Sequence, residues 1–490
     1  MRNNKKKYNQ ESIVFNKKIQ YIALIATAIV VFLFIGALAY LNALPFKYLV
    51  MIIIVILILL VISAYLLCCN HKTKLRKGIG FFLSLILIVT MLIGNFYLFS
   101  TYNMLSKISS NAGQTEDFYV VVLKSSDYNS IEDIKNKEVF VLKDSSDSSA
   151  YREAKAELMN KVDVTLTVDD DYVALGNELV DEQQNETDKI IFISNTNYEI
   201  LCEEISEYED LTKIIYTISI DIENKETTKA VNVTEEPFNV YISGIDTYGS
   251  IDKVSRSDVN MIMSINPSTK EILLTSIPRD MYVTLHSYGQ LDKLTHSGIY
   301  GIDETVTTVE DWLDVDLNYY IRVNFTSVED IIDAIGGVDV NSPVAFNSTV
   351  SKYSYVEGTN HLTGEAALFF ARERHAFSDG DNSRIKNQQR VIKGIIEKVT
   401  SSTSILTGYT KILNTIGDKA QTDLSSGDLA ELVKMQLNDL GGWTIKSQSI
   451  TGTGTYASTY SMGSRQLYVV IPNEESVKNA KAAIDTLMSK

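Results

Sequence analysis

Arginine and aspartate gather in three short segments of this chain. Only 11 of the 45 basic residues are arginine, and nine of these follow residue 100. Six of the nine lie in the runs VSRSDVN, SIPRDMYV and FFARERHAFSDGDNSRIKNQQR: Arg256, Arg279, Arg372, Arg374, Arg384 and Arg390. Guanidinium groups bind phosphate oxygens bidentately, and carboxylates hold Mg²⁺. The segments therefore predict a phosphoryl-transfer site, with surface ion pairs as the structural alternative.

Three long apolar runs precede these segments, at Ile19–Leu41, Tyr48–Cys69 and Ile79–Phe99. Each is long enough for a helix to cross the hydrocarbon core of a bilayer, which takes roughly 20 residues. Lysine and arginine crowd the N-terminal tail and the loop between the second and third runs, whereas the loop between the first two holds only Lys47. The positive-inside rule then predicts a multi-pass cell-membrane protein with a cytoplasmic N-terminus and extracellular domains after about Ser100.

The exported part is strongly acidic. The whole chain has a formal net charge of −16, and its first hundred residues are basic, so the remainder is more acidic than that total. Nucleic-acid binding rests on neutralising phosphates with basic residues, so nucleic acid is not an expected partner. Cysteine is scarce as well, because only Cys202 follows the apolar runs. The exported part therefore has no disulfide framework.

Strand and helix patterns alternate twice after the apolar runs, which predicts an α/β fold. Runs such as FYVVVL and KIIFIS belong to a first α/β region, and VNMIMSIN and EILLTSI to a second. A charged stretch separates the two regions. We predict a cytoplasmic tail, three transmembrane helices, a small α/β accessory domain, a linker and a catalytic domain, over residues 1–18, 19–100, 101–222, 223–237 and 238–490.

Several motifs of the second region, following one another over residues 238–400, carry a resemblance to a known family. They include SGIDTYG, SRSDVNMIMSINP, LLTSIPRDMYV, LDKLTHSGIYG and HLTGEAALFFARERHAFSDGDNSRIKNQQRVI. In order, spacing and identity these motifs resemble the LytR–CpsA–Psr family of bacterial cell-wall enzymes. The three apolar runs and the first α/β region are similar to its CpsA-like, capsule-associated branch.

The resemblance implies an α/β/α catalytic domain with a central mixed sheet and an apolar pocket for a polyprenyl tail. It also implies a Mg²⁺-dependent phosphotransferase, with Mn²⁺ as the alternative ion. Such an enzyme moves a glycopolymer, capsular polysaccharide or a teichoic-acid-like polymer, from an undecaprenyl-pyrophosphate carrier to peptidoglycan through a phosphodiester link. The implied partners are the lipid-linked glycan, peptidoglycan, membrane lipid and capsule-synthesis proteins.

The resemblance also assigns roles to single residues. The pyrophosphate-binding residues map onto Arg256, Arg279, Lys293, Arg372, Arg374, Arg384 and Gln388. The metal-binding aspartates map onto Asp246 and Asp258. We also count Arg279, Arg372 and Arg374 as catalytic, because a phosphoryl-transfer transition state needs positioned cations. From their positions beside Arg279 and Arg384, Asp280 and Asp381 are the candidates for the general base. Each of these two aspartates can instead hold the neighbouring guanidinium in place.

Spacing relates two pairs of candidate residues, and two further questions stay open. Arg384 and Gln388 are four residues apart on an expected helix and share one face of it. Arg256 and Asp258 point the same way if they lie on a strand. The apolar residues of LLTSI, IYG, VNF and ALFF line either a lipid pocket or an ordinary core. For the whole chain, a membrane regulator that binds lipid-linked intermediates and a polyprenyl-pyrophosphate hydrolase are the two alternative functions.

Overall fold

The computed structural model describes residues 17–41, 44–68, 74–110, 114–142, 149–169, 171–181, 189–222, 229–245, 251–378, 380–401, 419–439, 441–463 and 465–490. These residues fall into two compact units, residues 1–106 with 426–441 and residues 107–425 with 442–490.

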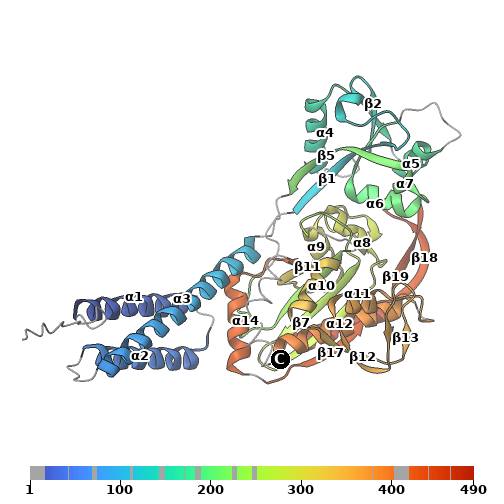
Figure 1. Ribbon diagram of the computed structural model, residues 1–490. Coiled ribbons are helices and arrows are strands. Elements are labelled where there is room, and N and C mark those ends of the chain that lie inside the picture. Colours follow the sequence, from blue (N-terminus) through green and yellow to red (C-terminus); the bar gives the residue numbers. More distant parts are fainter. Residues whose placement is uncertain are drawn as a thin grey trace, which may run out of the picture. The chain divides into compact units, whose positions relative to one another are not determined.

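The first unit holds three long apolar helices (Figure 1): α1 (Lys17–Leu41), α2 (Phe46–Cys68) and α3 (Lys74–Ser110). Each contains a stretch long and apolar enough to cross a membrane. Val31, Ile56 and Met91 bring the three helices together in one apolar cluster. A buried hydrogen bond of 2.6 Å joins the hydroxyls of Ser63 and Ser84. The helix α14 (Ser426–Asn438) also belongs to this unit.

A five-stranded mixed sheet forms the first part of the second unit, in the order β3-β2-β4-β1-β5. Its strands are β1 (Gln114–Leu123), β2 (Glu138–Leu142), β3 (Thr165–Asp169), β4 (Ile191–Ser194) and β5 (Thr212–Ile222). Its helices are η2 (Ile131–Ile134), α4 (Ser149–Lys161), α5 (Tyr172–Val180), α6 (Asn195–Glu204) and α7 (Tyr208–Leu211). Successive side chains of β1 alternate between two apolar clusters, one on each face of the sheet.

A six-stranded mixed sheet, in the order β16-β11-β6-β7-β8-β17, forms the second part. Its strands are β6 (Phe238–Ile245), β7 (Val259–Asn266), β8 (Glu271–Ile277), β11 (Tyr319–Asn324), β16 (Gln421–Thr422) and β17 (Thr444–Ser449). The neighbours β6, β7 and β8 are antiparallel, whereas β11 runs parallel to β6 and β17 parallel to β8. The predicted mixed central sheet is therefore confirmed.

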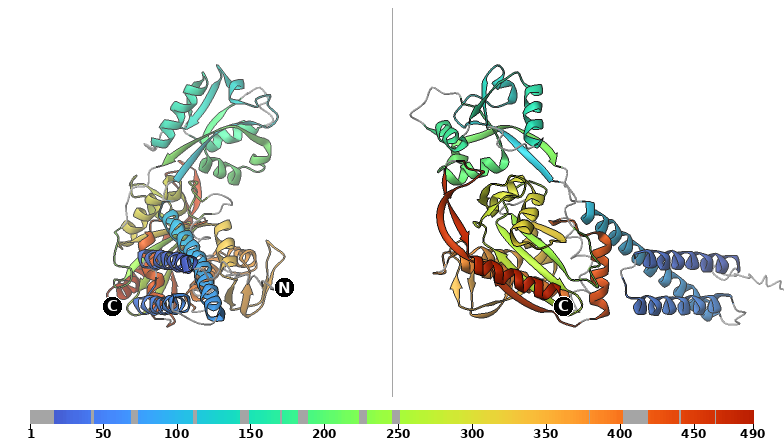
Figure 2. Two further views of the ribbon diagram at one scale, coloured as in Figure 1. Left: turned by 60° about the vertical axis from the view of Figure 1, so that its left-hand side comes forward. Right: turned by 180° about the vertical axis from the view of Figure 1, so that it is seen from behind.

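Helices cover both faces of this sheet and give three layers. On one face, α9 (Ile302–Leu313) and α15 (Glu474–Met488) form an apolar core with the strands. The helix α15 crosses this face near the C-terminus (Figure 2). The other face carries α10 (Phe325–Ala334), α11 (Gly364–Arg372) and α12 (Asp381–Thr400), and the site lies on this side.

Short elements complete the second part. The paired strands are β9 (Tyr282–Thr284) with β10 (Leu291–Lys293), β12 (Val338–Ser342) with β15 (Gly358–Leu362), β13 (Phe346–Asn347) with β14 (Ser354–Tyr355), and β18 (Gly452–Ser458) with β19 (Gln466–Pro472). The helix α8 (Leu294–Ser297) and the turn η4 (Gly298–Tyr300) follow β10 directly. Along the chain, the five-stranded sheet thus precedes the predicted linker at residues 223–237, and the six-stranded sheet follows it.

Candidate functional site

A cavity of about 390 Å³ opens between the six-stranded sheet and the helices α10, α11 and α12. Apolar side chains form most of its wall: Ile242, Ile245, Val259, Val323, Phe325, Val328, Val350, Leu368, Phe369, Ala371, Val391 and Ile392. The VNF and ALFF segments therefore contribute to this wall. Leu273 of LLTSI and Ile299 of IYG lie instead in packed cores. This volume and this lining are typical of a small-molecule site.

Charged and amide side chains line the same cavity. They are Asp258, Asn324, Arg372, Arg374, Arg384 and Gln388, and the imidazole of His375 lines the cavity as well. Arg384 and Gln388 both line it, as their spacing on one helix predicts. Arg372 lies at the last turn of α11, and its guanidinium carbon is 4.1 Å from the ring centre of Phe325. Stacking on an aromatic face orients a guanidinium without using its hydrogen-bond donors.

A second, much smaller pocket of about 40 Å³ gathers four more of the predicted residues: Arg256, Arg279, Asp280 and Lys293. Its polar lining consists of Arg256, Arg279, Asp280, Lys293, Thr295, His296 and Glu204, the last of these from α6. The predicted phosphate-binding residues thus fall into two sets, three arginines and Gln388 at the cavity, and two arginines and Lys293 at the small pocket. We call these the cavity set and the pocket set.

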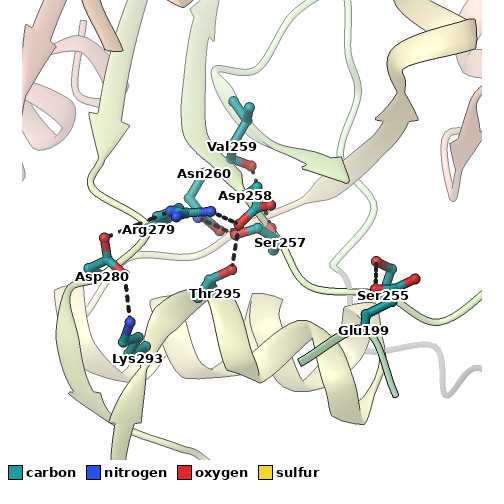
Figure 3. A network of polar contacts seen from close by, with 10 residues as sticks. All are labelled: Glu199, Ser255, Ser257, Asp258, Val259, Asn260, Arg279, Asp280, Lys293 and Thr295. Atoms are coloured by element: carbon teal, nitrogen blue, oxygen red, sulfur yellow. Dashed lines mark hydrogen bonds and ion pairs between the residues drawn. The ribbon is translucent and has the colours of Figure 1, made fainter. Parts of the chain in front are cut away.

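Asp258 joins the two sets, because it lines the cavity and also contacts residues of the small pocket (Figure 3). Its Oδ1 accepts hydrogen bonds from Arg279 Nη1 at 2.8 Å and from Thr295 Oγ1 at 2.9 Å. Its Oδ2 is buried and has no hydrogen-bond partner within the described part of the chain. One oxygen of this carboxylate therefore holds the arginine, and the other has an open coordination position.

Electrostatics keep both members of this pair charged. Burial raises the pKa of Asp258, but the guanidinium groups of Arg279 and Arg256 outweigh that effect, so the pKa lies below its ordinary value. For Arg279, burial lowers the pKa, whereas the carboxylates of Asp258 and Asp280 raise it above its ordinary value. The site thus presents fixed charges at neutral pH.

Asp280 lies beside two cations. Its Oδ1 accepts a hydrogen bond of 3.0 Å from Lys293 Nζ, and its Oδ2 is 3.8 Å from Arg279 Nε (Figure 3). These contacts match the alternative in which Asp280 holds a neighbouring cation. The other candidate for the base, Asp381, begins α12, and its side chain lies outside the described residues, as does the whole of Asp246.

Arg256 and Asp258 do not lie on a strand, so the condition for their side chains to point the same way is not met. The strand β7 begins one residue later, at Val259. Residues 254–258 form a loop instead, because its amides bond to two different elements: Ser257 N donates to Thr295 O and Asp258 N to Gly244 O. A Cβ at Gly298 would lie 2.6 Å from Ser255 O, so the start of η4 approaches this loop more closely than any side chain permits.

Two positioning residues escape sequence reasoning. Glu373 lies between two cavity-set arginines and is fully buried. Its carboxylate accepts bonds from Thr349 N and Oγ1, both at 2.7 Å, and from the backbone amides of Arg374 and Ala376. Arg322 is buried too and donates to backbone carbonyls in the segment before Arg256, at Ile251 and Lys253. Neither residue stands out by type or spacing, since a buried charge looks like a surface charge in a sequence.

The donor set around Asp258 fits a Mg²⁺ ion. Mg²⁺ commonly takes only one or two carboxylates from the protein and completes its shell with water and substrate phosphates. The unbonded Oδ2 of Asp258 supplies one such ligand. Among the described residues, no three or more histidine, cysteine, aspartate or glutamate side chains are placed to hold a metal ion together, so an all-protein cage is not the arrangement that they form.

Known proteins are similar in sequence to the layered α/β/α domain that holds this site. The model of the LytR_cpsA_psr family matches residues 208–482, which is more than half of the chain. The chain therefore belongs to the LytR_cpsA_psr family. This confirms the resemblance of the motifs.

Named relatives are similar to this chain. The polyisoprenyl-teichoic acid–peptidoglycan teichoic acid transferase TagU of Enterococcus faecalis is 32% identical over 250 residues, which cover 50% of this chain and 80% of that protein. The protein of the same name from Bacillus cereus is 38% identical over 200 residues, covering 41% and 64%. The crystal structure of B. subtilis TagU has 30% identity and a TM-score of 0.42, covering 52% and 98%.

Proposed function

We propose that this protein transfers a glycopolymer from a polyprenyl-pyrophosphate carrier to peptidoglycan. The observation that supports this most directly is one cavity with a long apolar wall and Arg372, Arg374 and Arg384 among its lining residues. A polyprenyl chain needs such a wall, and a pyrophosphate needs such charges. The names of the relatives, which specify a polyisoprenyl donor and a peptidoglycan acceptor, support the same reaction.

The reaction is an in-line displacement at phosphorus. A hydroxyl of the acceptor attacks the phosphorus that carries the glycan, and the polyprenyl phosphate leaves. Because charge spreads over the equatorial oxygens, catalysis depends mainly on positioned cations. In our proposal the cavity set binds one phosphate and the pocket set the other, with the Asp258–Arg279 pair between them. Gln388 adds a neutral donor beside Arg384.

Mg²⁺, or Mn²⁺ in its place, belongs to this proposal. Asp258 would hold the ion through Oδ2, with Asp246 as a further ligand. When bound, the ion neutralises charge on the pyrophosphate oxygens. Arg279 then serves two purposes, since it keeps Asp258 ionised and faces the pocket itself.

Reconstitution of the full chain in detergent tests the function. The donor is a short-chain polyprenyl pyrophosphate that bears a saccharide, the acceptor is peptidoglycan, and Mg²⁺ is added. We expect a phosphodiester-linked product and released polyprenyl phosphate. Arg279→Ala should lower the rate by about 10²-fold or more, the scale of losing one positioned charge contact. Arg152→Ala removes an exposed arginine on α4 and serves as the matched control.

The same assay separates the alternative functions. Release of phosphate without acceptor, at the rate seen with acceptor, would identify a hydrolase. A folded protein that binds the donor and yields no product in either case would identify a regulator. Donors that carry capsular polysaccharide or teichoic-acid repeats decide which polymer is used, and only capsular transfer calls for capsule-synthesis proteins as partners.

The proposed location follows from the three apolar helices. We place the N-terminus in the cytoplasm and both sheets outside the cell, because basic residues crowd the tail and the loop between α2 and α3. An epitope tag at each end of the chain checks this. In intact cells, protease should remove the C-terminal tag and spare the N-terminal one.

A further inference from the structure

Three histidine–aspartate pairs occur among the described residues, and one of them differs from the others. In the pairs His286–Asp311 and His361–Asp339, both side chains are 46–63% exposed. In the third, His296 is 5% exposed and Asp292 is not exposed at all. The distances between nitrogen and oxygen are alike, at 2.6, 2.8 and 2.7 Å. Burial, rather than pairing, therefore distinguishes His296.

Hydrogen bonds hold Asp292 in a fixed position. Its Oδ1 accepts a bond of 2.7 Å from Lys293 N, and its Oδ2 a bond of 2.7 Å from Ser461 N. His296 Nδ1 lies 2.7 Å from Oδ1 and 2.8 Å from Ser461 Oγ. An ionised carboxylate only accepts hydrogen bonds, so the proton of a neutral imidazole belongs on Nδ1. The lone pair of that imidazole is then on Nε2.

The position of His296 puts this ring beside the proposed pyrophosphate site. His296 lines the small polar pocket together with Arg256, Arg279 and Lys293. Thr295, the residue before it, bonds to Asp258, which also lines the cavity. Within the described residues Nε2 makes no hydrogen bond. An imidazole with its Nδ1 bonded to a buried carboxylate, and its other nitrogen available, is the arrangement used for general-base catalysis.

We propose that His296, oriented by Asp292, accepts the proton of the acceptor hydroxyl during transfer. This role rests on the proposed function. The acceptor oxygen forms a bond to phosphorus while its proton moves to Nε2, and the bond from phosphorus to the bridging oxygen breaks. That oxygen leaves with the polyprenyl phosphate. The imidazolium is stabilised by the Asp292 carboxylate and afterwards releases its proton to solvent. Asp280 is then free of a catalytic role and holds Lys293.

Histidine to asparagine is the sharpest substitution. The asparagine amide can donate to Asp292 much as Nδ1 does, yet it carries no base. His361→Asn makes the same change in the exposed pair on β15 and is the matched control. Each full-length variant is assayed with the short-chain donor and peptidoglycan, and donor affinity is measured separately by titration without acceptor.

We expect His296→Asn to lower kcat by about 10²- to 10⁴-fold, the range for loss of a general base, with donor Kd within about twofold. In a plot of kcat against pH, the wild-type protein should show a rising limb that the variant lacks. The other charged groups that face His296 are Asp292, Lys293, Arg256, Arg279, Asp280 and Glu204, and the same limb should persist in Glu204→Gln. Asp292→Asn should lower kcat as well, because it no longer selects the productive tautomer.

Every other outcome counts against this role. An active His296→Asn with the wild-type pH profile would overturn it. Equal losses of kcat, donor affinity and Tm would make His296 a structural tie between β10 and Ser461. In His296→Ala, added imidazole should restore part of the rate, and no restoration in a folded variant contradicts a proton acceptor. If the wild-type protein itself forms no product, the proposed function fails first, and the role of His296 falls with it.

Discussion

The two large sheets use their faces differently. In the five-stranded sheet, Val120 and Val121 point to opposite faces, and both are completely buried in apolar clusters. In the six-stranded sheet, Tyr241 lies in the core, whereas its neighbour Ile242 lines the cavity. Both sheets follow the same alternation of side chains, but the second leaves part of one face unfilled beside arginines. The first sheet is thus packed on both faces, whereas the second leaves part of one face open where a ligand could pack.

Matched leucine substitutions test this contrast in stability and should give the largest effect. Leu158 is fully buried in the core of the five-stranded sheet, and Leu368 lines the cavity. We expect Leu158→Ala to lower the free energy of unfolding by about 4 kcal/mol and Leu368→Ala by about 2 kcal/mol, both within the usual range for this change. The side chain beside the cavity has fewer contacts to lose. Chemical denaturation of the full chain measures both, and equal losses would abolish the distinction.

Arg372→Ala tests the contrast in function. Removing a positioned charge should lower the transfer rate by about 10²-fold or more, close to 3 kcal/mol in the transition state. The stacking on Phe325 at 4.1 Å contributes much less to folding, about 1 kcal/mol. Steady-state kinetics and a thermal melt of one preparation measure both quantities. A melt that falls steeply while kcat stays constant would show that Arg372 is structural.

The carboxyl group of Glu116, near the start of β1, should give a smaller effect on stability that depends on pH. Burial, and next the neighbouring carboxylate of Asp117, raise the pKa of Glu116 to about 8. The folded protein then holds a proton that the unfolded chain has released above pH 4.5, so the contribution of Glu116 to stability is largest at low pH and falls as pH rises toward 8. We expect a loss of about 1–2 kcal/mol between pH 6 and 8. Glu116→Gln should flatten this dependence, and an unchanged slope would contradict it.

Narrowing the cavity should give the smallest effect. Ile392 lines the apolar wall on α12 and is only partly buried. A phenylalanine there takes space that a long polyprenyl chain needs, so Ile392→Phe should raise KM for a long-chain donor by about tenfold, or 1.4 kcal/mol. A donor with a very short chain should be unaffected. If both donors weaken alike, the chain does not enter the cavity.

Much of the fold follows from local pattern. The runs VNMIMSIN and EILLTSI are strands, and residues 364–372 and 381–400 are helices, because their periodicity, caps and turns agree with one another. The three apolar helices follow from composition in the same way. The residue types of the site are also visible, since arginine is rare in this chain.

Local pattern could not predict which residues come together in the site. Alternation along a strand separates two faces but does not say which face is packed and which is hollow, so VNF and LLTSI look equivalent. The loop that carries Arg256 is fixed by tertiary hydrogen bonds at Ser257 and Asp258, which local pattern does not show. Glu373 and the His296 pair depend on burial, which has no signature in one sequence.

The close approach of Gly298 to the loop of Arg256 has a mechanical consequence. With backbone packed on backbone there, the loop of Arg256 cannot shift without η4. The backbone amide of Thr295 donates to Arg279 O, which ties a second arginine of the pocket set to the same region. The cavity set lies instead at the end of α11, just after it, and on α12. A small displacement of these two helices would therefore change the distance between the two sets while leaving each set intact. If the proposed diphosphate binds both sets, the grip on it would be adjusted with no rearrangement inside either half.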